Sequence, residues 1–250
     1  MAVLIYPAGI SPGFYFPEKL LTTLENQLIA RLPRQSRGSL AKLCEPVQLT
    51  MADVLCDGAK PIRHVYFPTG AFVSLVTLLD GKPALEVGMV GREGMLGAQM
   101  ALGVLSEPLY AIVQGAGSAW RIGTLAFQRE LDRNLALRQS LRRYLHVTMT
   151  QLAQSAACLR FHQIGPRLAR WLLMTQDRAG SKNFRVTHEF LALMLGVRRV
   201  GITTAAVALQ RQGLVKYHRG DITILDRRGL EKAASGCYAN DRKAYAELLR

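Results

Sequence analysis

The distribution of glycine divides this sequence into two parts that must fold differently. Glycines are frequent up to Gly123, where they separate short runs of β-branched and aromatic residues. The next glycine is Gly165, and the residues between these two have a helical period. Short runs bounded by turn residues indicate strands, whereas apolar residues spaced by three and four indicate helices. We therefore expect an α+β protein in which the strands come first.

The strand-rich part extends from about residue 45 to residue 122. Its apolar runs are "HVYFPTGAFVSLVTLL", "PALEVGMVG" and "LYAIVQGAGSAWRI", with a tight turn at Asp80-Gly81. Short strands separated this often by turns are typical of an antiparallel sandwich or barrel. Before it, a segment interrupted by proline and glycine leads into an amphipathic helix predicted over Lys19–Leu32, which Pro33 ends.

Residues 124–164 predict one long helix with an apolar stripe. The stripe steps by four and three residues, at Leu141, Leu145, Thr148, Leu152, Ser155 and Leu159. Such a period of 3.5 residues is typical of paired helices, so we interpret the stripe as the interface of a homodimer. The alternative is that the stripe packs on the strand-rich part of its own chain.

Charge points to an anionic partner. The sequence holds 32 Lys and Arg residues against 18 Asp and Glu residues, a formal net charge of +14. Most of the excess lies in residues 160–250, with 17 basic and 7 acidic residues, against 15 and 11 in residues 1–159. Nucleic acid is the simplest partner for such a surface. The alternative is a general adjustment of charge for solubility.

The stretch "LALMLGVRRVGITTAAVALQRQGLV", residues 191–215, predicts two helices joined by a short turn. Thr187 is a candidate N-cap, and Glu189 follows in the first turn, where its charge suits the helix dipole. Gly196-Val197 forms the turn, and the second helix begins at the two arginines. These lengths are typical of a helix-turn-helix, in which the second helix enters the major groove of DNA.

One side of the second helix is apolar and the other is available for DNA. Arg199, Thr203, Val207 and Gln210 share the outer side, where we expect their side chains to be unpaired. A following strand, turn and strand, "GLVKYHRGDITILD", adds a basic hairpin suited to phosphates. A solvated face without function is the alternative. The predicted DNA-binding residues are Arg198, Arg199, Val200, Thr203, Thr204, Gln210, Lys216, His218 and Arg219.

Residues 25–235 resemble the Crp/Fnr family of bacterial transcription regulators, the relatives of the cyclic-AMP receptor protein. The resemblance rests on the order of the glycine-rich roll, the long helix and the segment that ends in "ITILDRRGLE". It implies an N-terminal antiparallel β-roll (a cyclic-nucleotide-binding-like jelly roll), a long dimerisation helix and a C-terminal winged helix-turn-helix. It also implies a homodimer on a near-palindromic operator of double-stranded DNA, with RNA polymerase as a further partner.

The resemblance makes Arg199 the guanine-contacting arginine of the family, but neighbouring positions depart from the pattern. Arg198 stands where the family prefers a serine N-cap. Val200 and Thr204 stand where the cyclic-AMP relatives carry glutamate and arginine. The operator sequence therefore does not follow from the family.

The segment equivalent to the cyclic-nucleotide site also departs from the family. The relatives hold the nucleotide with a Gly-Glu pair and an Arg-Ser pair, where this sequence has Gly97-Ala98 and Pro108-Leu109. No Lys or Arg occurs between Glu93 and Trp120, so a buried phosphate would lack a countercharge. We expect a small-molecule effector, if any, to differ from cyclic AMP.

Arg92 and Glu93 lie in a glycine corner, "EVGMVGREGMLG". We interpret this corner as an exposed turn with a local ion pair. The alternative is a contact with an effector or with the second subunit.

No cofactor or metal site is predicted. Cys44, Cys56, Cys158 and Cys237 are scattered, without a CxxC pair or a histidine at zinc-finger spacing. The five histidines look isolated, and neither an iron–sulfur cluster nor a haem is indicated. The sequence also has no P-loop, GxSxG or dinucleotide-binding motif, so we expect no enzyme. No signal peptide or membrane span is indicated, which favours the cytoplasm and no membrane partner.

We divide the chain into an N-terminal segment and helix (1–37), a sensor-like β-roll (38–123), a long dimerisation helix (124–164), a winged helix-turn-helix (165–235) and a tail (236–250). The predicted function is sequence-specific DNA binding by a homodimeric transcription regulator. The alternative is a ligand-binding or protein-interaction module with a vestigial helix-turn-helix.

Overall fold

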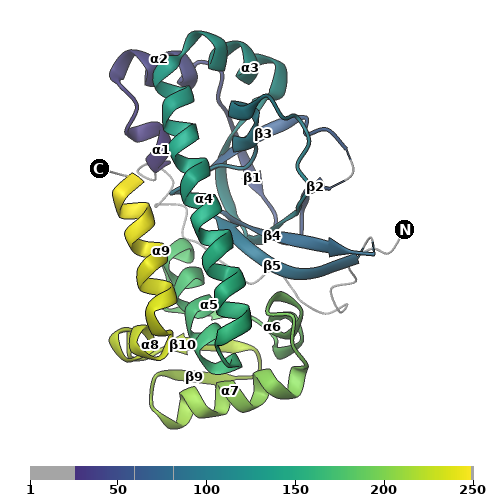
Figure 1. Cartoon of the computed structure of the whole chain (residues 1–250), viewed down its shortest axis with the longest axis vertical. Helices are drawn as coiled ribbons and strands as arrows, with labels where there is room; N and C mark the ends of the chain where they lie inside the picture. The colour runs from purple at the N-terminus through teal and green to yellow at the C-terminus, as the bar shows by residue number, and fades with distance from the viewer. Residues whose placement is uncertain (1–25, 59, 81, 249–250) are drawn as a thin grey trace. The chain divides into compact units, whose positions relative to one another are not determined.

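The structure is a computed structural model that describes residues 26–58, 60–80 and 82–248 of the 250-residue chain (Figure 1). These residues form two compact units. The first comprises the described residues of Met1–Pro83 together with Met89–Val147, and the second comprises Ala84–Gly88 together with Thr148–Leu248. Most of the predicted helix Lys19–Leu32 lies outside the described residues, as does Gly81 of the predicted turn.

The strands between Glu45 and Gly123 form the predicted antiparallel roll. Its sheets have the strand orders β1-β7-β3 and β2-β6-β4-β5, and every strand pair with an assigned register is antiparallel. Val65, Phe67 and Ile122 are fully buried, which places the core on alternate positions of the strands. The strands are β1 (Glu45–Leu49), β2 (Val54–Asp57), β3 (His64–Pro68), β4 (Phe72–Leu79), β5 (Lys82–Val90), β6 (Tyr110–Gly115) and β7 (Gly117–Gly123).

Two short helices precede the roll. The side chain of Asn26 caps α1 (Gln27–Ala30) by accepting hydrogen bonds from the N–H groups of Leu28 and Ile29. α1 ends at Ala30, before the predicted end at Leu32, and Pro33 stands at the N-cap of α2 (Arg34–Ala41), a helix that was not predicted. Proline is compatible with a helix start because the first N–H groups have no partner within the helix.

The predicted helix 124–164 is two helices, α3 (Thr124–Arg133) and α4 (Leu135–Phe161). Asn134 separates them with φ −108° and ψ 86°. Its side-chain Oδ1 accepts a hydrogen bond from Leu137 N–H at 3.1 Å, so it caps the second helix. The prediction of one helix was wrong because a central asparagine was not considered as a cap.

The apolar stripe of α4 is not one continuous exposed seam. Leu141 and Ser155 are buried within the chain, whereas Leu152 and Leu159 are each 38% exposed. Met149, which lay outside the predicted stripe, is 67% exposed. The chain itself thus covers part of the predicted interface, as the alternative interpretation expects, and leaves a neighbouring line of α4 uncovered.

The second unit packs its helices around α5 (Ile164–Ala179), whose residues 168–169 and 171–176 are buried. Leu172, Leu191, Ile202 and Leu230 come from four different helices and are at most 1% exposed, so they form its core. A three-stranded sheet of order β8-β10-β9 completes the unit. The remaining elements are β8 (Asn183–Arg185), α6 (His188–Met194), α7 (Arg199–Arg211), β9 (Val215–His218), β10 (Asp221–Ile224), α8 (Arg227–Ala233) and α9 (Ser235–Leu248).

Among the described residues, no single helix has both the length and the apolar composition to cross a membrane. The pair α6 and α7 meets that test only when taken together, and it is bent by 109°.

Candidate nucleic-acid interface

The first helix of the predicted helix-turn-helix begins as expected. Thr187 is the N-cap of α6, and its Oγ1 accepts a hydrogen bond from Phe190 N–H at 3.1 Å. Glu189 lies in the first turn, exposed near the positive end of the helix dipole. Both predictions are confirmed.

A tight turn then reverses the chain at Gly196. The Gly196 N–H donates to Leu193 O at 3.1 Å, and the Val197 N–H donates to Ala192 O at 2.9 Å. This pair of bonds is a Schellman cap, which needs a left-handed residue, and Gly196 has φ +60°. α6 and α7 consequently meet at 109°, within the range of a helix-turn-helix.

A side chain of α5 fixes the end of α6. The guanidinium of Arg167 donates to the carbonyl oxygen of Leu195, one of the last carbonyls of α6. These carbonyls have no partner within their own helix, so the arginine both satisfies one of them and suits the negative end of the dipole. The turn is thereby tied to α5.

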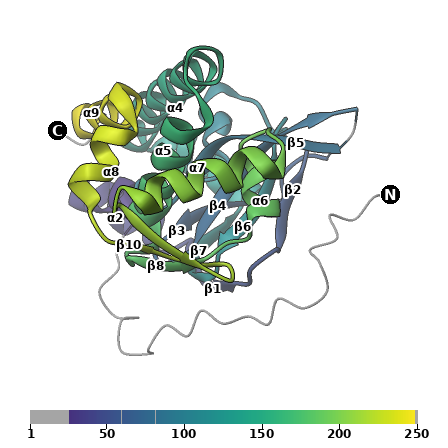
Figure 2. The ribbon, with the colours of Figure 1, turned by 90° about the horizontal axis from the view of Figure 1, so that it is seen from below.

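The second helix, α7, has one buried and one exposed side. Ile202, Ala205, Ala206 and Leu209 are buried, as the apolar spacing predicted. Figure 2 shows α7 with α6 beside it. Arg198 stands at the N-cap, and its side chain makes no capping hydrogen bond. The start of α7 therefore presents unsatisfied N–H groups together with two cationic side chains, an arrangement that suits an external anion.

All nine predicted DNA-binding residues are exposed. Val200 is 69% exposed, which is unusual for an apolar side chain without a partner. The hydroxyls of Thr203 and Thr204 donate back to the carbonyls of Arg199 and Val200 at 3.2 and 3.0 Å, as is common for threonine within helices. Their methyl groups and the valine are thus available for contacts with thymine methyls.

The expectation that the side chains on the outer side of α7 are unpaired is wrong for Gln210. Its Oε1 accepts a hydrogen bond from Tyr217 N–H at 2.9 Å and so links α7 to strand β9. Thr203 also has a partner, because its Oγ1 lies 3.0 Å from Nδ1 of His188. Gln210 and Thr203 therefore hold elements together, whereas the side chain of Arg199 makes no hydrogen bond or ion pair with another described residue.

The basic hairpin has the predicted form. His218 pairs with Asp221 across a two-residue turn in which Arg219 and Gly220 have φ values of +47° and +92°. Positive φ at both turn positions matches the twist of an antiparallel hairpin. The turn projects His218 and Arg219 at its tip, with exposed Lys216 further along β9.

His188 and Tyr217 connect these parts, and the sequence analysis missed their role. The two rings stack at 4.3 Å between centroids with an interplanar angle of 20°. The Tyr217 hydroxyl donates to Val186 O at 3.1 Å. Burial, with a further contribution from Arg199, lowers the pKa of His188, so its neutral form is favoured. An aromatic residue at one strand position and a histidine at a helix start carry no spacing signal that would reveal the contact.

The sensor-like roll is tightly packed where a nucleotide would be expected. Gly97 has φ +96° and precedes the 3-10 helix η2 (Ala98–Leu102). A Cβ at Gly97 would lie 2.6 Å from Cγ1 of Val65. Glu107 is 9% exposed, and burial raises the pKa of its carboxyl. A buried acidic side chain is unfavourable for a phosphate.

The glycine corner is partly internal. Arg92 is exposed, but the Glu93 carboxylate is half-buried and accepts a hydrogen bond from Gly91 N–H at 3.2 Å. A Cβ at Gly94 would lie 2.2 Å from the Tyr144 hydroxyl oxygen, so glycine is needed for this close approach. The corner therefore has a structural role in packing, and no effector contact is indicated by these bonds.

The structure brings together three residues that the sequence analysis treated as unrelated. The ligand atoms of Cys158, His162 and Cys237 lie within 4.8 Å of one another. The expectation that the cysteines are scattered and the histidines isolated was wrong for these three. Cys158 and His162 are four residues apart, one helical turn, so their spacing was a signal that could have been used. Cys237 is distant in sequence and reaches them only through the packing of α9.

Comparisons with known proteins agree with this geometry. The family model of the Crp-like helix-turn-helix domain matches residues 166–233. No curated protein sequence matches the chain. Among solved structures, a Crp/Fnr family transcriptional regulator from Eubacterium rectale is similar with a TM-score of 0.66, 18% identity, and coverage of 84% of this chain and 99% of that one.

Two further solved structures share the fold. FixK2 from Bradyrhizobium japonicum has a TM-score of 0.63 and 16% identity, covering 77% of this chain and 98% of its own. The c-di-GMP responsive global regulator CLP from Xanthomonas campestris has a TM-score of 0.62 and 15% identity, covering 78% and 100%. The Eubacterium rectale and Xanthomonas campestris proteins are described as regulators.

Proposed function

The chain carries a Crp-like helix-turn-helix domain in the fold of Crp/Fnr regulators, and we propose that it is a transcription regulator that binds double-stranded DNA. The observation that carries this proposal is the start of α7. The side chains of Arg198 and Arg199 are exposed there and make no hydrogen bond or ion pair with any described residue, at a helix end whose own dipole repels them. A DNA phosphate backbone beside this end would reverse the sign of that interaction.

The roles of the two arginines differ in the proposal. Arg199, as the first residue of α7, enters the major groove and donates to a guanine edge, with Val200, Thr203 and Thr204 beside it. Arg198 precedes the helix and meets a phosphate. On the hairpin, Lys216, His218 and Arg219 contact the flanking backbone, and Gln210 positions the hairpin against α7.

We propose that the protein acts as a homodimer through α4. The line Leu145, Met149, Leu152, Ala156 and Leu159 steps by four and three residues and is exposed or half-exposed. We propose this line in place of the predicted stripe, because Leu141 and Ser155 of that stripe are buried. Each subunit would contact one half of a near-palindromic operator, with half-sites about one helical turn apart.

Sedimentation of the purified protein tests the interface. We expect a dimer for the wild type and a monomer for Met149→Glu with Leu152→Glu, because two charges cannot be buried there without partners. Glutamates at exposed Arg143 and Ala157, which lie off this line, serve as the matched control on the same helix. A dimer that survives the first pair of substitutions would contradict the α4 interface while leaving DNA binding open.

Selection of bound duplexes from a random pool tests the function itself. We expect an enriched motif with two related half-sites, and no effect of cyclic AMP on the enrichment. Addition of c-di-GMP, which the Xanthomonas relative responds to, and of a metabolite extract reveals whether an effector exists. Failure to enrich any motif under all conditions would favour the protein-interaction alternative. RNA polymerase as a partner and the cytoplasm as the location stay predictions.

A further inference from the structure

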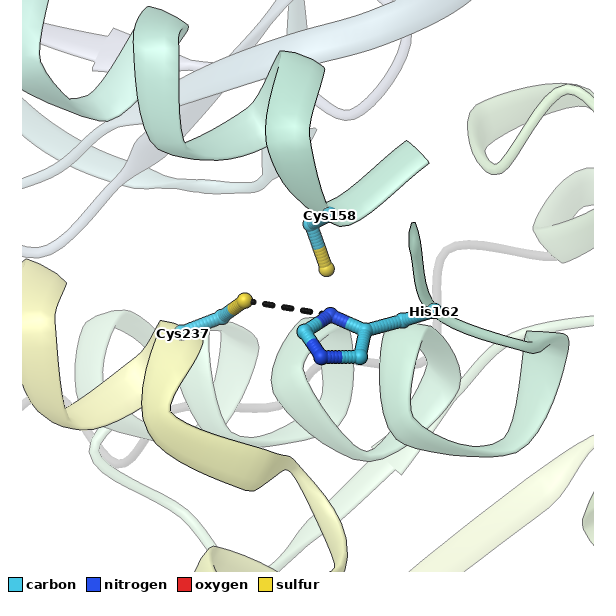
Figure 3. A group of neighbouring side chains, drawn as sticks. All are labelled: Cys158, His162 and Cys237. Atoms are coloured by element: carbon cyan, nitrogen blue, oxygen red, sulfur yellow. Dashed lines mark hydrogen bonds between the residues drawn. The ribbon is translucent and has the colours of Figure 1, made fainter. Parts of the chain in front are cut away.

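Cys158, His162 and Cys237 converge from three elements of the second unit (Figure 3). Cys158 comes from the last turns of α4, His162 from the residues directly after it, and Cys237 from the first turn of α9. The Sγ atom of Cys237 lies 3.3 Å from Nδ1 of His162. Figure 3 shows all three side chains pointing toward one common space.

The donor set is chemically suited to a transition metal. Two thiols and one imidazole nitrogen are ligands that Zn²⁺ prefers. In a tetrahedral zinc site, two sulfur atoms lie about 3.8 Å apart, and a sulfur and a nitrogen about 3.6 Å apart, as follows from Zn–S and Zn–N distances of about 2.3 and 2.0–2.1 Å. The observed separations, from 3.3 Å to at most 4.8 Å, need shifts of about 1 Å or less to reach these values.

Neighbouring groups already orient these ligands. The Ser235 hydroxyl lies 3.3 Å from Nε2 of His162, the nitrogen that faces away from the cysteines. If Nε2–H donates to this hydroxyl, Nδ1 is left with its lone pair toward the cluster. Ser235 holds this place with an unusual φ of +57°, at the break between α8 and α9.

The second cysteine is oriented by a chain of amides. Gln154 Nε2 donates to the Cys237 sulfur at 3.0 Å, and Asn240 Nδ2 donates to Gln154 Oε1 at 3.1 Å. Burial raises the pKa of the Cys158 thiol to about 11, and the guanidiniums of Arg170 and Arg167 oppose this rise only in part. Hydrogen bonds directed at the sulfur atoms are typical of the surroundings of metal-binding thiolates.

Access to the cluster comes from one side. Both cysteines are 2% exposed, whereas His162 is half-buried. An ion could therefore enter along the imidazole and then be shielded from water by the two cysteines. Three protein ligands leave one tetrahedral position for a water molecule.

We propose that Cys158, His162 and Cys237 form a binding site for a divalent transition metal, with Zn²⁺ as the best match. The bound ion would join the end of α4 to the start of α9, two helices that flank α5 in the second unit. Metal would thus stabilise this unit, because a ligand that binds only the folded state raises its stability. The site is independent of DNA binding, and its test needs no DNA.

Titration of the reduced full-length protein with Co²⁺ tests the site, since cobalt reports thiolate ligands by charge-transfer absorption and tetrahedral geometry by visible bands. We expect one Co²⁺ per chain, displaced by Zn²⁺. Cys158→Ser and Cys237→Ser should each abolish the thiolate signal. Ser235→Ala should weaken binding by about 10- to 100-fold, as expected for a group that orients a ligand.

The matched control is Cys44→Ser with Cys56→Ser, which removes two thiols from the first unit and should leave the titration unchanged. Zn²⁺ should also raise the Tm of the wild type and of this control, but not of Cys237→Ser. If circular dichroism shows that a variant does not fold, the wild type decides the question. Bound Zn²⁺ should then protect Cys158 and Cys237 of the wild type from an alkylating reagent. Absence of stoichiometric Co²⁺ binding to the reduced protein, or formation of a Cys158–Cys237 disulfide in its place, would overturn the proposal.

Discussion

The second unit contains two sets of cationic side chains that differ in how their charge is satisfied. The inner set is held by partners of the same chain, whereas the outer set makes no hydrogen bond or ion pair with the described residues. The inner set is Arg167, Arg170 and Arg227. The outer set is Arg198, Arg199, Lys216 and Arg219.

The inner arginines join helices. Arg170 of α5 pairs with Asp241 of α9 at 2.7 Å, and their side chains are only 13% and 5% exposed. Arg227 of α8 pairs with Asp177 at 2.8 Å and donates to Gln176 at 2.7 Å, both in α5. Arg170 and Arg227 are therefore each paired with a carboxylate of the same chain. The outer side chains have no such ion pair with any described residue and do not join elements of the fold. The inner set therefore joins helices of the unit, and we propose that the outer set serves binding.

Removal of an inner arginine should have the largest effect on stability. Arg170→Ala leaves the Asp241 carboxylate buried, with one oxygen that already lacks a hydrogen-bond partner among the described residues. We expect a loss of about 3–5 kcal/mol in the free energy of unfolding, measured by urea denaturation, because a buried charge without its partner is strongly unfavourable.

The double variant Arg170→Met with Asp241→Leu is the control for this prediction. It removes both charges and should recover most of the lost stability, since a buried pair is often no better than apolar residues of similar volume. Burial raises the pKa of Asp241 in spite of Arg170, which agrees with a pair whose desolvation is incompletely compensated. Equal stability of Arg170→Ala and the wild type would remove the basis for the comparison.

Removal of an outer arginine should affect binding and not folding. Arg199→Ala is expected to reduce discrimination at one base pair by about 1–3 kcal/mol, measured by competition between operator variants. The urea midpoint should stay unchanged because Arg199 has no internal partner and alanine favours a helix.

Arg198→Ala provides the matched comparison at the adjacent position. We expect this substitution to weaken binding to all DNA sequences equally, since a phosphate contact carries no sequence information. If Arg198→Ala changes base preference and Arg199→Ala does not, the roles of the two residues are reversed.

The sequence predicts the outer set well because the helix-turn-helix is local. Thr187, Gly196 and the buried side of α7 are all specified by residues within one short segment. The absence of a side-chain cap at Arg198 was expected, because arginine stands there in place of the serine that the family prefers. None of these features depends on how distant segments pack.

Contacts between distant segments could not be predicted in the same way. Gln210 looked free because Tyr217 reaches it only when β9 folds back on α7. The Asp241 pair and the Cys158–His162–Cys237 cluster both require α9 to return to the end of α4 and to α5. Such groups have no fixed spacing in the sequence, so only the tertiary structure shows them together.

The hairpin cations should contribute mainly through salt-dependent phosphate contacts. Lys216→Gln and Arg219→Asn should each lower the slope of log affinity against log salt by about 1. Asparagine is chosen at Arg219 because it tolerates the positive φ of +47° better than alanine. Lys60→Gln, in the first unit, should leave the slope unchanged. An unchanged slope in the hairpin variants would place these side chains outside the interface.

The smallest expected effect is a pH dependence of the protein's stability that arises from His188. In its neutral form this side chain links α6, α7 and β9. Burial, together with Arg199, lowers the pKa of His188 below its ordinary 6.5. The unfolded chain then binds the proton more readily than the folded one, so stability should fall as pH decreases through 6.5. His188→Gln should reduce this dependence in thermal unfolding measured across that range. His64 in the first unit, whose pKa burial also lowers, remains in both proteins, so their difference isolates His188. Identical pH dependence in the two proteins would show that the stacked histidine does not titrate with folding.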